Sequence, residues 1–310
     1  MDKVTVDGAG WFAVGGVRLC VLGAGTPTPT SERFGSGYAV VIGDDVLLVD
    51  CGPATTEKLV RAGLWPLAVS HLFFTHHHFD HDVDYPCLLL CRWDQGTGGE
   101  STLQVYGPPP TSELTDKLIG EHGAFAHDWK ARIGHPTSQR VFVNRGGTLP
   151  RTPPVVDAFD IEPGWMMEHE GWRMTCCRAQ HVQPYLDSVA YRLDASGGSI
   201  VFAGDTEPCD ELVSLAAGAD LLIGMCWDLE CTMQGSGESG GQCGARGAGE
   251  MARAAGVKRL VLSHLGPSLS RGGARDDAMA EVRESYDGDV TFAEELEWVI
   301  GEGGGVRNGR

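Results

Sequence analysis

Long hydrophobic runs and a disulfide framework are both missing from this sequence of 310 residues. No stretch approaches the roughly 20 apolar residues that a membrane-spanning helix requires, and the first 16 residues lack the basic region and the continuous apolar stretch of a signal peptide. The ten cysteines follow no repeating spacing, and a chain of this length folds without disulfide bonds. We therefore expect a cytoplasmic protein with no membrane partner and with mostly buried thiols.

Runs of lysine and arginine are also missing, and the charge is strongly acidic. The chain has 24 Lys and Arg against 42 Asp and Glu, which gives a formal net charge of -18. Such a surface repels polyanions unless a local basic patch overrides it. Nucleic acid is therefore not expected as a partner, although folding can gather separate arginines onto one face.

Strand and helix patterns are both present along the whole chain. Short apolar runs that end in Gly, Asp or His predict strands, and amphipathic stretches with a Gly near the C-terminal end predict helices. The predicted strands cover 18–25, 38–52, 71–76, 103–110, 172–181, 188–194, 199–206, 220–227 and 258–266, and the predicted helices cover 53–63, 111–125, 209–219, 246–256 and 276–286. This mixture favours one layered α/β domain over residues 1–310.

Two internal segments and the C-terminal end differ from this pattern. Residues 92–154 are richer in Gly and Pro and predict a loop-rich insertion. Residues 235–249, GSGESGGQCGARGAG, predict a mobile or tightly turned loop. Each is a candidate cover for a site, with a plain surface loop as the alternative. Residues 301–310 predict a flexible tail.

The densest polar cluster follows a short apolar run. Residues 70–85, SHLFFTHHHFDHDVDY, contain five histidines and three aspartates. Strand alternation puts His76 and His78 on one side of an extended turn, and Asp80 and His81 enter the next helix from another angle. The segment therefore offers ligands for two metal ions. It lacks the zincin pattern of two histidines four residues apart with an intervening Glu.

Further metal-ligand types stand at the ends of three other predicted strands. His181 follows WRMTCCRAQ, Asp205 follows SIVFAG and His264 follows KRLVLS. In α/β sheets, sites assemble at the carboxyl ends of strands. Four strand ends that carry His or Asp therefore predict one shared metal site.

These residues match the motifs of a known family. Thr75, His76, His78, Asp80 and His81 fit the T-H-x-H-x-D-H motif of the metallo-β-lactamase superfamily, and His181, Asp205 and His264 fit its later His, Asp and His. Within the superfamily the chain resembles the ribonuclease Z-like branch through VLGAGTPTPTSER, LLVDCG and VYGPPPT. The resemblance implies a four-layer αββα sandwich, with two sheets packed face to face and helices on both outer sides, and a homodimer.

The resemblance also implies a ligand set. It assigns His76, His78 and His181 to a first zinc ion, Asp80, His81 and His264 to a second, and Asp205 to a bridge between the two. Ligands without thiolate suit zinc and also admit manganese or iron. Asp50, in VDCG, is expected to accept a hydrogen bond from a ligand histidine. His77 should point away from the ions, and His71 should be a packed or solvated histidine.

Two such ions predict hydrolysis. They lower the pKa of bound water to about 7 and polarise the bond under attack, so the expected nucleophile is a metal-bridging hydroxide. The expected substrate is a small organic molecule, such as an ester, a phosphodiester or an activated aryl compound. Asp80, Asp228 and Glu230 are candidate proton donors, and Trp227 is a candidate wall of an aromatic pocket.

Three alternatives stay open at this point. The branch likeness favours a tRNA 3′-end endonuclease, but residues 240–256 lack the histidine that this branch commonly carries there, and no flexible basic arm is found. A hydrolytic aryl dehalogenase or lactonase would use the same hydroxide. An iron-containing redox variant would use the same scaffold.

Overall fold

The strands pair into two sheets. The computed structural model describes residues 16–270 and 273–300, and within them each sheet has seven strands, in the orders β14-β1-β2-β3-β4-β5-β6 and β13-β12-β11-β10-β9-β8-β7. The bounds are β1 Val17–Ala24, β2 Ser36–Ile42, β3 Asp45–Val49, β4 Val69–Phe73, β5 Leu103–Gly107, β6 Val156–Asp160, β7 Met166–His169, β8 Trp172–Arg178, β9 Val189–Ala195, β10 Gly198–Phe202, β11 Leu221–Met225, β12 Arg259–Ser263, β13 Asp289–Phe292 and β14 Trp298–Ile300.

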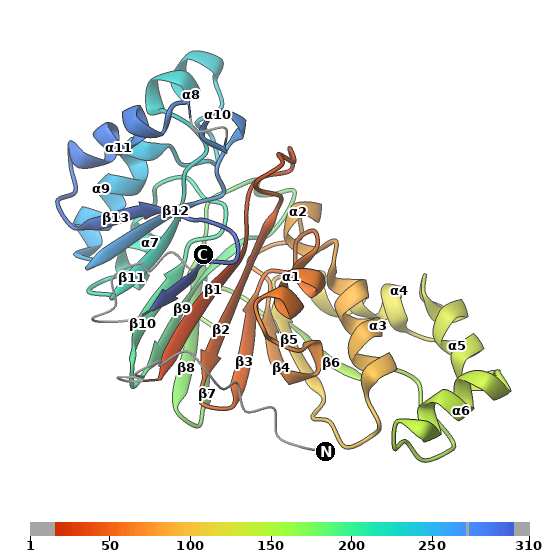
Figure 1. Cartoon of the computed structure of the whole chain (residues 1–310). Helices are drawn as coiled ribbons and strands as arrows, with labels where there is room; N and C mark the ends of the chain where they lie inside the picture. The colour runs from red at the N-terminus through yellow and green to blue at the C-terminus, as the bar shows by residue number, and fades with distance from the viewer. Residues whose placement is uncertain (1–15, 271–272, 301–310) are drawn as a thin grey trace.

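Helices cover both outer faces of the sheet pair (Figure 1). Helices α1, α3 and α4 lie on the first sheet, and α7, α9 and α11 lie on the second. The bounds are α1 Thr55–Arg61, η1 Pro66–Ala68, α2 Phe79–Asp82, α3 Tyr85–Gln95, α4 Thr111–Ile119, α5 Ala126–Gly134, α6 Pro136–Asn144, α7 Asp210–Leu215, α8 Glu230–Ser236, α9 Ala245–Ala255, α10 Pro267–Ser270 and α11 Arg275–Arg283. The predicted four-layer αββα sandwich is confirmed. No helix in the described ranges is long and apolar enough to cross a bilayer.

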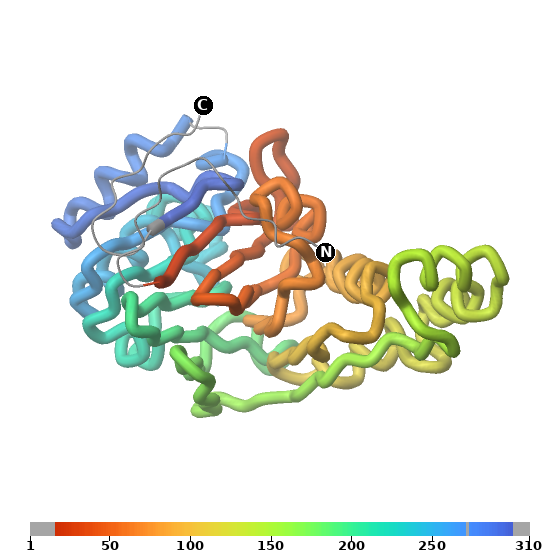
Figure 2. Tube along the Cα trace, turned by 60° about the horizontal axis from the view of Figure 1, so that its bottom comes forward, coloured from red at the N-terminus to blue at the C-terminus, as the bar shows by residue number. Residues whose placement is uncertain are grey.

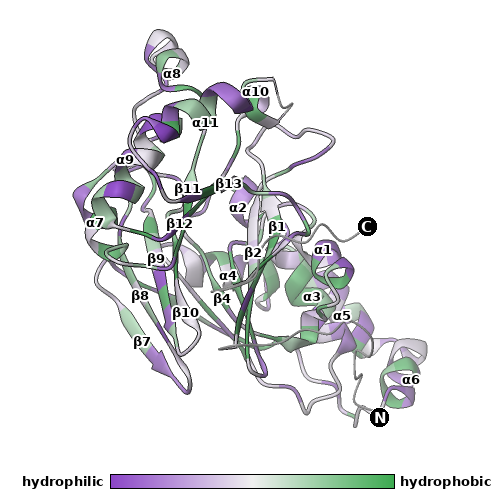
Figure 3. Cartoon of the chain, turned by 60° about the vertical axis from the view of Figure 1, so that its left-hand side comes forward, coloured by the Kyte–Doolittle hydropathy of each residue, from purple (hydrophilic) through white to green (hydrophobic). Residues whose placement is uncertain are grey.

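Apolar side chains on both faces of the central strands hold these layers together. In β1, Leu19 and Val21 point into the core between the sheets, whereas Cys20 and Leu22 point into the core under the helices of the first sheet. A strand buried on both faces has a continuous apolar run instead of an alternating pattern. Figure 3 shows this as hydrophobic colour along the strands and more hydrophilic colour on the outer helices.

The structure corrects the expectation of a loop-rich insertion over residues 92–154. This segment contains β5, which lies inside the first sheet, and helices α4, α5 and α6. Several of its glycines and prolines stand at the helix ends: Gly120 follows α4, Pro136 begins α6, and Gly146 follows α6. These are the positions that Gly and Pro prefer, so their density marks short helices. Helices α5 and α6 extend away from the two sheets (Figure 2).

The glycine-rich segment 235–249 is also shorter as a loop than expected. Helix α8 continues to Ser236, and α9 begins at Ala245. Only residues 237–244 connect the two helices. The predicted flexible tail at 301–310 lies outside the described residues.

Shortening a side chain in the core between the sheets should destabilise the protein. Leu193 of β9 is fully buried in this core. We expect Leu193→Ala to lower the free energy of unfolding by about 2 to 5 kcal/mol, because it removes buried apolar contacts and leaves a cavity. Urea unfolding followed by circular dichroism measures this change. Val155→Ala, at a side chain that is 67% exposed, is the control, and an equal loss in both variants would contradict the layer assignment.

Candidate metal centre

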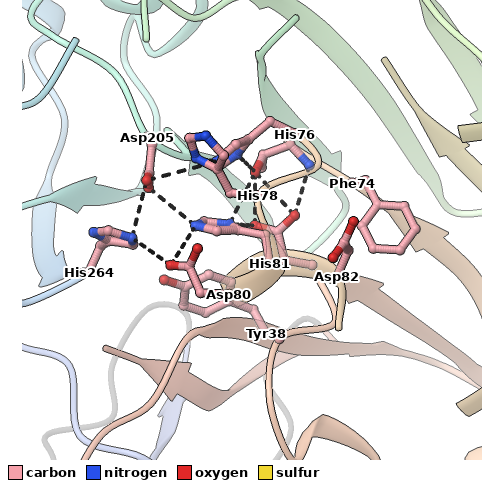
Figure 4. A network of polar contacts seen from close by, with 12 residues as sticks. Tyr38, Phe74, His76, His78, Asp80, His81, Asp82, Asp205 and His264 are labelled. Atoms are coloured by element: carbon pink, nitrogen blue, oxygen red, sulfur yellow. Dashed lines mark hydrogen bonds and ion pairs between the residues drawn. The ribbon is translucent and has the colours of Figure 1, made fainter. Parts of the chain in front are cut away.

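Four strand ends from the two sheets meet at one edge of the sandwich. The segment that contains His76, His78, Asp80 and His81 follows β4 of the first sheet; His181 follows β8, Asp205 follows β10 and His264 follows β12 of the second. Their side chains converge, and Figure 4 labels all of them except His181. The structure thus brings together all seven residues that the sequence predicted as ligands. They form two groups, and within each group the ligand atoms lie within 4.8 Å of one another.

The first group consists of His76, His78, His181 and Asp205. His78 Nδ1 lies 3.1 Å from His76 Nε2 and 3.2 Å from His181 Nε2. Asp205 Oδ2 lies 3.9 Å from His76 Nε2 and 3.8 Å from His181 Nε2. Three imidazole nitrogens and one carboxylate oxygen therefore surround one point.

The second group consists of Asp80, His81 and His264. Asp80 Oδ2 lies 3.6 Å from His81 Nε2 and 3.3 Å from His264 Nε2. Asp205 reaches this group too, because its Oδ1 lies 3.4 Å from His81 Nε2 and its Oδ2 lies 3.1 Å from His264 Nε2. Asp205 therefore lies between the two groups.

The spacing and the unpaired atoms of these groups fit divalent metal ions. Ligands about 2.1 Å from a tetrahedral ion lie about 3.4 Å apart, and the distances between ligand atoms given above lie around that value. Asp80 Oδ1, His81 Nε2 and Asp205 Oδ1 are buried and have no hydrogen-bond partner. Buried polar atoms without a partner are costly, and a cation between them would remove that cost.

Burial and neighbouring charges set the protonation of these groups. Burial, followed by the neighbouring His81, lowers the pKa of His76 well below its usual range, so His76 is neutral at pH 7, the form that binds a metal. Burial alone would raise the pKa of Asp205, but His264 and His81 beside it lower that pKa well below its usual range. Asp205 is therefore an anion.

Asp50 lies where the sequence analysis expected it. His81 Nδ1 donates to Asp50 Oδ2 at 2.8 Å, so His81 Nε2 faces the second group. The backbone N–H of Thr75 donates to Asp50 Oδ1 at 2.8 Å, and the Thr75 hydroxyl donates to Oδ2 at 2.9 Å. The Thr75 hydroxyl also lies 3.1 Å from His76 Nδ1. Asp50 and Thr75 thus orient one histidine of each group.

Trp227 and Asp228 follow β11 but lie differently from each other. The Trp227 ring lies 6.2 Å from the His264 ring, between ring centres, and its Nε1 donates to Glu238 at 3.1 Å. The Asp228 carboxylate accepts from the backbone N–H of Leu229 at 2.7 Å. No hydrogen bond among the described residues joins Asp228 to the seven clustered residues. Trp227 is therefore the one of this pair that borders the centre.

His77 and His71 lie outside the centre, as expected. His77 Nε2 lies 2.8 Å from the Thr111 hydroxyl, and His77 Nδ1 lies 3.2 Å from Asp82. His71 packs edge-on against Trp172, with the ring centres 5.0 Å apart. Burial lowers the pKa of His71 to about 4, so it is a neutral core residue.

Gly241 is a supporting residue that the sequence analysis did not single out. His181 Nδ1 donates to the Gly241 carbonyl at 2.6 Å, and the Gly241 N–H donates to Glu207 at 2.8 Å. Gly241 has φ +73°, and a Cβ there would lie 2.0 Å from the His181 carbonyl oxygen. The high glycine content of residues 235–249 was the only sign of this role in the sequence, and it does not show that Gly241 contacts His181. This segment therefore holds a histidine of the first group.

Comparison with known proteins agrees with this geometry. Residues 46–265 match the model of the beta-lactamase superfamily domain. The chain belongs to the metallo-β-lactamase superfamily. Ribonuclease Z of Mycobacterium sp. (strain KMS) is 30% identical over 273 residues, which cover 84% of this chain and 88% of that relative.

Two solved structures have the same metallo-β-lactamase fold. The metallo-β-lactamase fold protein YhfI from Bacillus subtilis gives a TM-score of 0.70 at 22% identity, over 92% of this chain and all of that one (100%). The short form of human tRNase Z gives a TM-score of 0.63 at 20% identity, over 91% of this chain and 98% of that one. The predicted superfamily and its ribonuclease Z-like branch are confirmed, and the chain is a metal-dependent hydrolase that binds divalent metal.

Asp50 should set the metal affinity of the second group. Asp50→Asn keeps the size of the side chain but removes the charge that holds His81, so we expect about 10- to 100-fold weaker zinc binding at the second group. Competition with a chromophoric chelator measures both affinities. Asp45→Asn is the matched control, because Asp45 begins the strand β3 that Asp50 follows. An unchanged affinity in Asp50→Asn would refute the orienting role.

The Gly241 contact should set the affinity of the first group. Gly241→Ala strains the backbone and displaces the His181 loop, so we expect the first ion to be lost during dialysis while the second stays bound. Elemental analysis of the dialysed protein gives the ratio of ions to chain. The neighbouring Gly240→Ala adds a Cβ with nothing within 4 Å and should keep both ions. Retention of both ions in Gly241→Ala would refute this support.

Proposed function

We propose that the chain, as a single domain over residues 1–310, is a dinuclear zinc phosphodiesterase of the ribonuclease Z type that cleaves RNA. His76, His78 and His181 hold the first ion, Asp80, His81 and His264 hold the second, and Asp205 bridges them. The observation that carries the proposal is the position of Asp205, within 3.9 Å of a histidine nitrogen of each group. The 30% identity to a ribonuclease Z supports the choice of reaction.

The charges of this centre suit a phosphodiester. When bound, two divalent ions activate a water molecule and stabilise the charge that develops on the phosphoryl oxygens. The chain contributes two carboxylates, Asp80 and Asp205, and otherwise imidazoles. The loaded centre thus stays net positive and attracts an anionic phosphodiester. As a metal ligand Asp80 is an ionised carboxylate, so it can deliver a proton to the leaving group only after it has accepted one from the attacking water.

The net charge of the whole chain is unfavourable for RNA binding, but the local charge of residues 120–151 is favourable. Residues 120–151 contain five Lys and Arg and two Asp and Glu, a charge of +3, so the rest of the chain has 19 against 40, or −21. Lys130, Arg132 and Arg140 are exposed on α5 and α6, the helices that extend away from the sheets (Figure 2). Asp94 pairs with Arg132, Arg145 and Arg151 and reduces this charge. The other two basic side chains, Lys130 and Arg140, are exposed and suit contacts to phosphates.

Hydrolysis of a small phosphodiester is the second candidate. The strongly acidic remainder of the chain and the absence of a histidine from residues 240–256 favour it. It uses the same centre and the same ligands. The two candidates therefore differ only in the size of the molecule that carries the phosphodiester.

The experiment combines metal analysis with turnover. We expect two zinc ions per chain and cleavage of both bis(p-nitrophenyl) phosphate and a tRNA precursor with a 3′ extension. Asp205→Ala should lose roughly a thousandfold in kcat/KM on both substrates, because the bridge that supports both ions is removed. Asp157→Ala, at an exposed carboxylate of β6, is the control.

The outcomes separate the candidates. Cleavage of the small substrate alone selects the second candidate. Cleavage of neither substrate by the zinc-loaded protein refutes both. Iron as the bound metal would point to oxygen chemistry on the same scaffold.

A further inference from the structure

Two large aromatic side chains are exposed beside the metal ligands. Phe79 lies between His78 and Asp80 and is 52% exposed, and Tyr185 lies four residues after His181 and is 92% exposed. The two loops that carry them meet at the centre, because His78 Nδ1 lies 3.2 Å from His181 Nε2. Phe79, the first residue of α2, and Tyr185, in the loop after β8, therefore belong to two segments whose metal-binding histidines meet at the centre.

The loop that carries Tyr185 is held by its own hydrogen bonds. The backbone N–H of His181 donates to Gln183 Oε1 at 2.8 Å, and Gln183 Nε2 donates to the Ala179 carbonyl at 2.8 Å. The N–H of Tyr185 donates to the Val182 carbonyl at 3.0 Å and closes a turn. The loop thus exposes Tyr185 in a defined position next to a metal-binding histidine.

Phe79 belongs to a small apolar surface on α2. Val83, one helical turn later, is also exposed. Exposed apolar groups that gather next to a reaction centre mark a binding surface. The seven clustered side chains are polar ligands, so these aromatic rings offer a different kind of contact to a substrate.

We propose that Tyr185 and Phe79 form a stacking surface for a nucleobase of the nucleotide whose phosphate lies at the metal centre. The inference rests on the proposed function and deepens it, because it names a nucleotide as the unit that the site recognises. A phosphate at the ions brings the base of the same nucleotide to the rim of the site, where aromatic rings stack on bases with little regard to sequence. Trp227 is a weaker candidate, because its Nε1 is already bonded to Glu238.

Binding of mononucleotides tests this surface without catalysis. In isothermal calorimetry on the zinc-loaded protein, adenosine 5′-phosphate should bind about tenfold more tightly than ribose 5-phosphate, which lacks the base. Tyr185→Ala and Phe79→Leu should each reduce this ratio, and Tyr185→Trp should keep it. Trp65→Ala is the matched control. Trp65 is also an exposed aromatic residue, at 54% exposure, but it lies before the start of β4, whereas His76 follows the other end of that strand. Zinc content is measured in every variant.

The outcomes are distinct from those of the proposed function. Equal affinities of the wild-type protein for the two ligands, or an unchanged ratio in both Tyr185→Ala and Phe79→Leu with zinc retained, would overturn the inference. The proposed function can fail while this inference holds. In that case the protein would bind adenosine 5′-phosphate in preference to ribose 5-phosphate but would cleave no phosphodiester. A reduced ratio in Trp65→Ala would also count against the assignment to the site rim.

Discussion

The buried carboxylate of Asp205 is the interaction on which the rest of the site depends. It lies 3.1 to 3.9 Å from nitrogens of four histidines, which come from strand ends of both sheets. A buried carboxylate is tolerated only when cations or hydrogen-bond donors surround it. The packing of the two sheets brings these donors to one edge, so the fold and the site are two consequences of the same arrangement of strands.

The ligands could be predicted from sequence because each follows a recognisable apolar run. His264 directly follows β12, and Asp205 and His181 come within three residues of β10 and β8. The carboxyl ends of strands meet in space, so the order of residue types already indicated a cluster. The strand and helix patterns predicted only a layered α/β domain, and the four-layer sandwich was implied by the resemblance to the superfamily; strands apolar on both faces, which need a layer on each side, agree with it.

The supporting contacts could not be predicted in the same way. The carbonyl of Gly241 and the hydroxyl of Thr75 act through positions that tertiary packing alone determines. Helices α5 and α6 were missed because the Gly and Pro at their ends resemble loop composition. The same helices show that a net charge describes a whole chain, whereas a substrate meets the local field of one surface.

The bond between His181 and Gly241 joins residues that are 60 positions apart. Closing a loop of that length costs conformational entropy, and the order of residues 237–244 depends in part on this bond. The free energy with which the first group holds an ion therefore includes the entropy of ordering a loop that is distant from His181 in the sequence. A change in that loop that weakens this bond can therefore alter the residence time of an ion without touching any ligand.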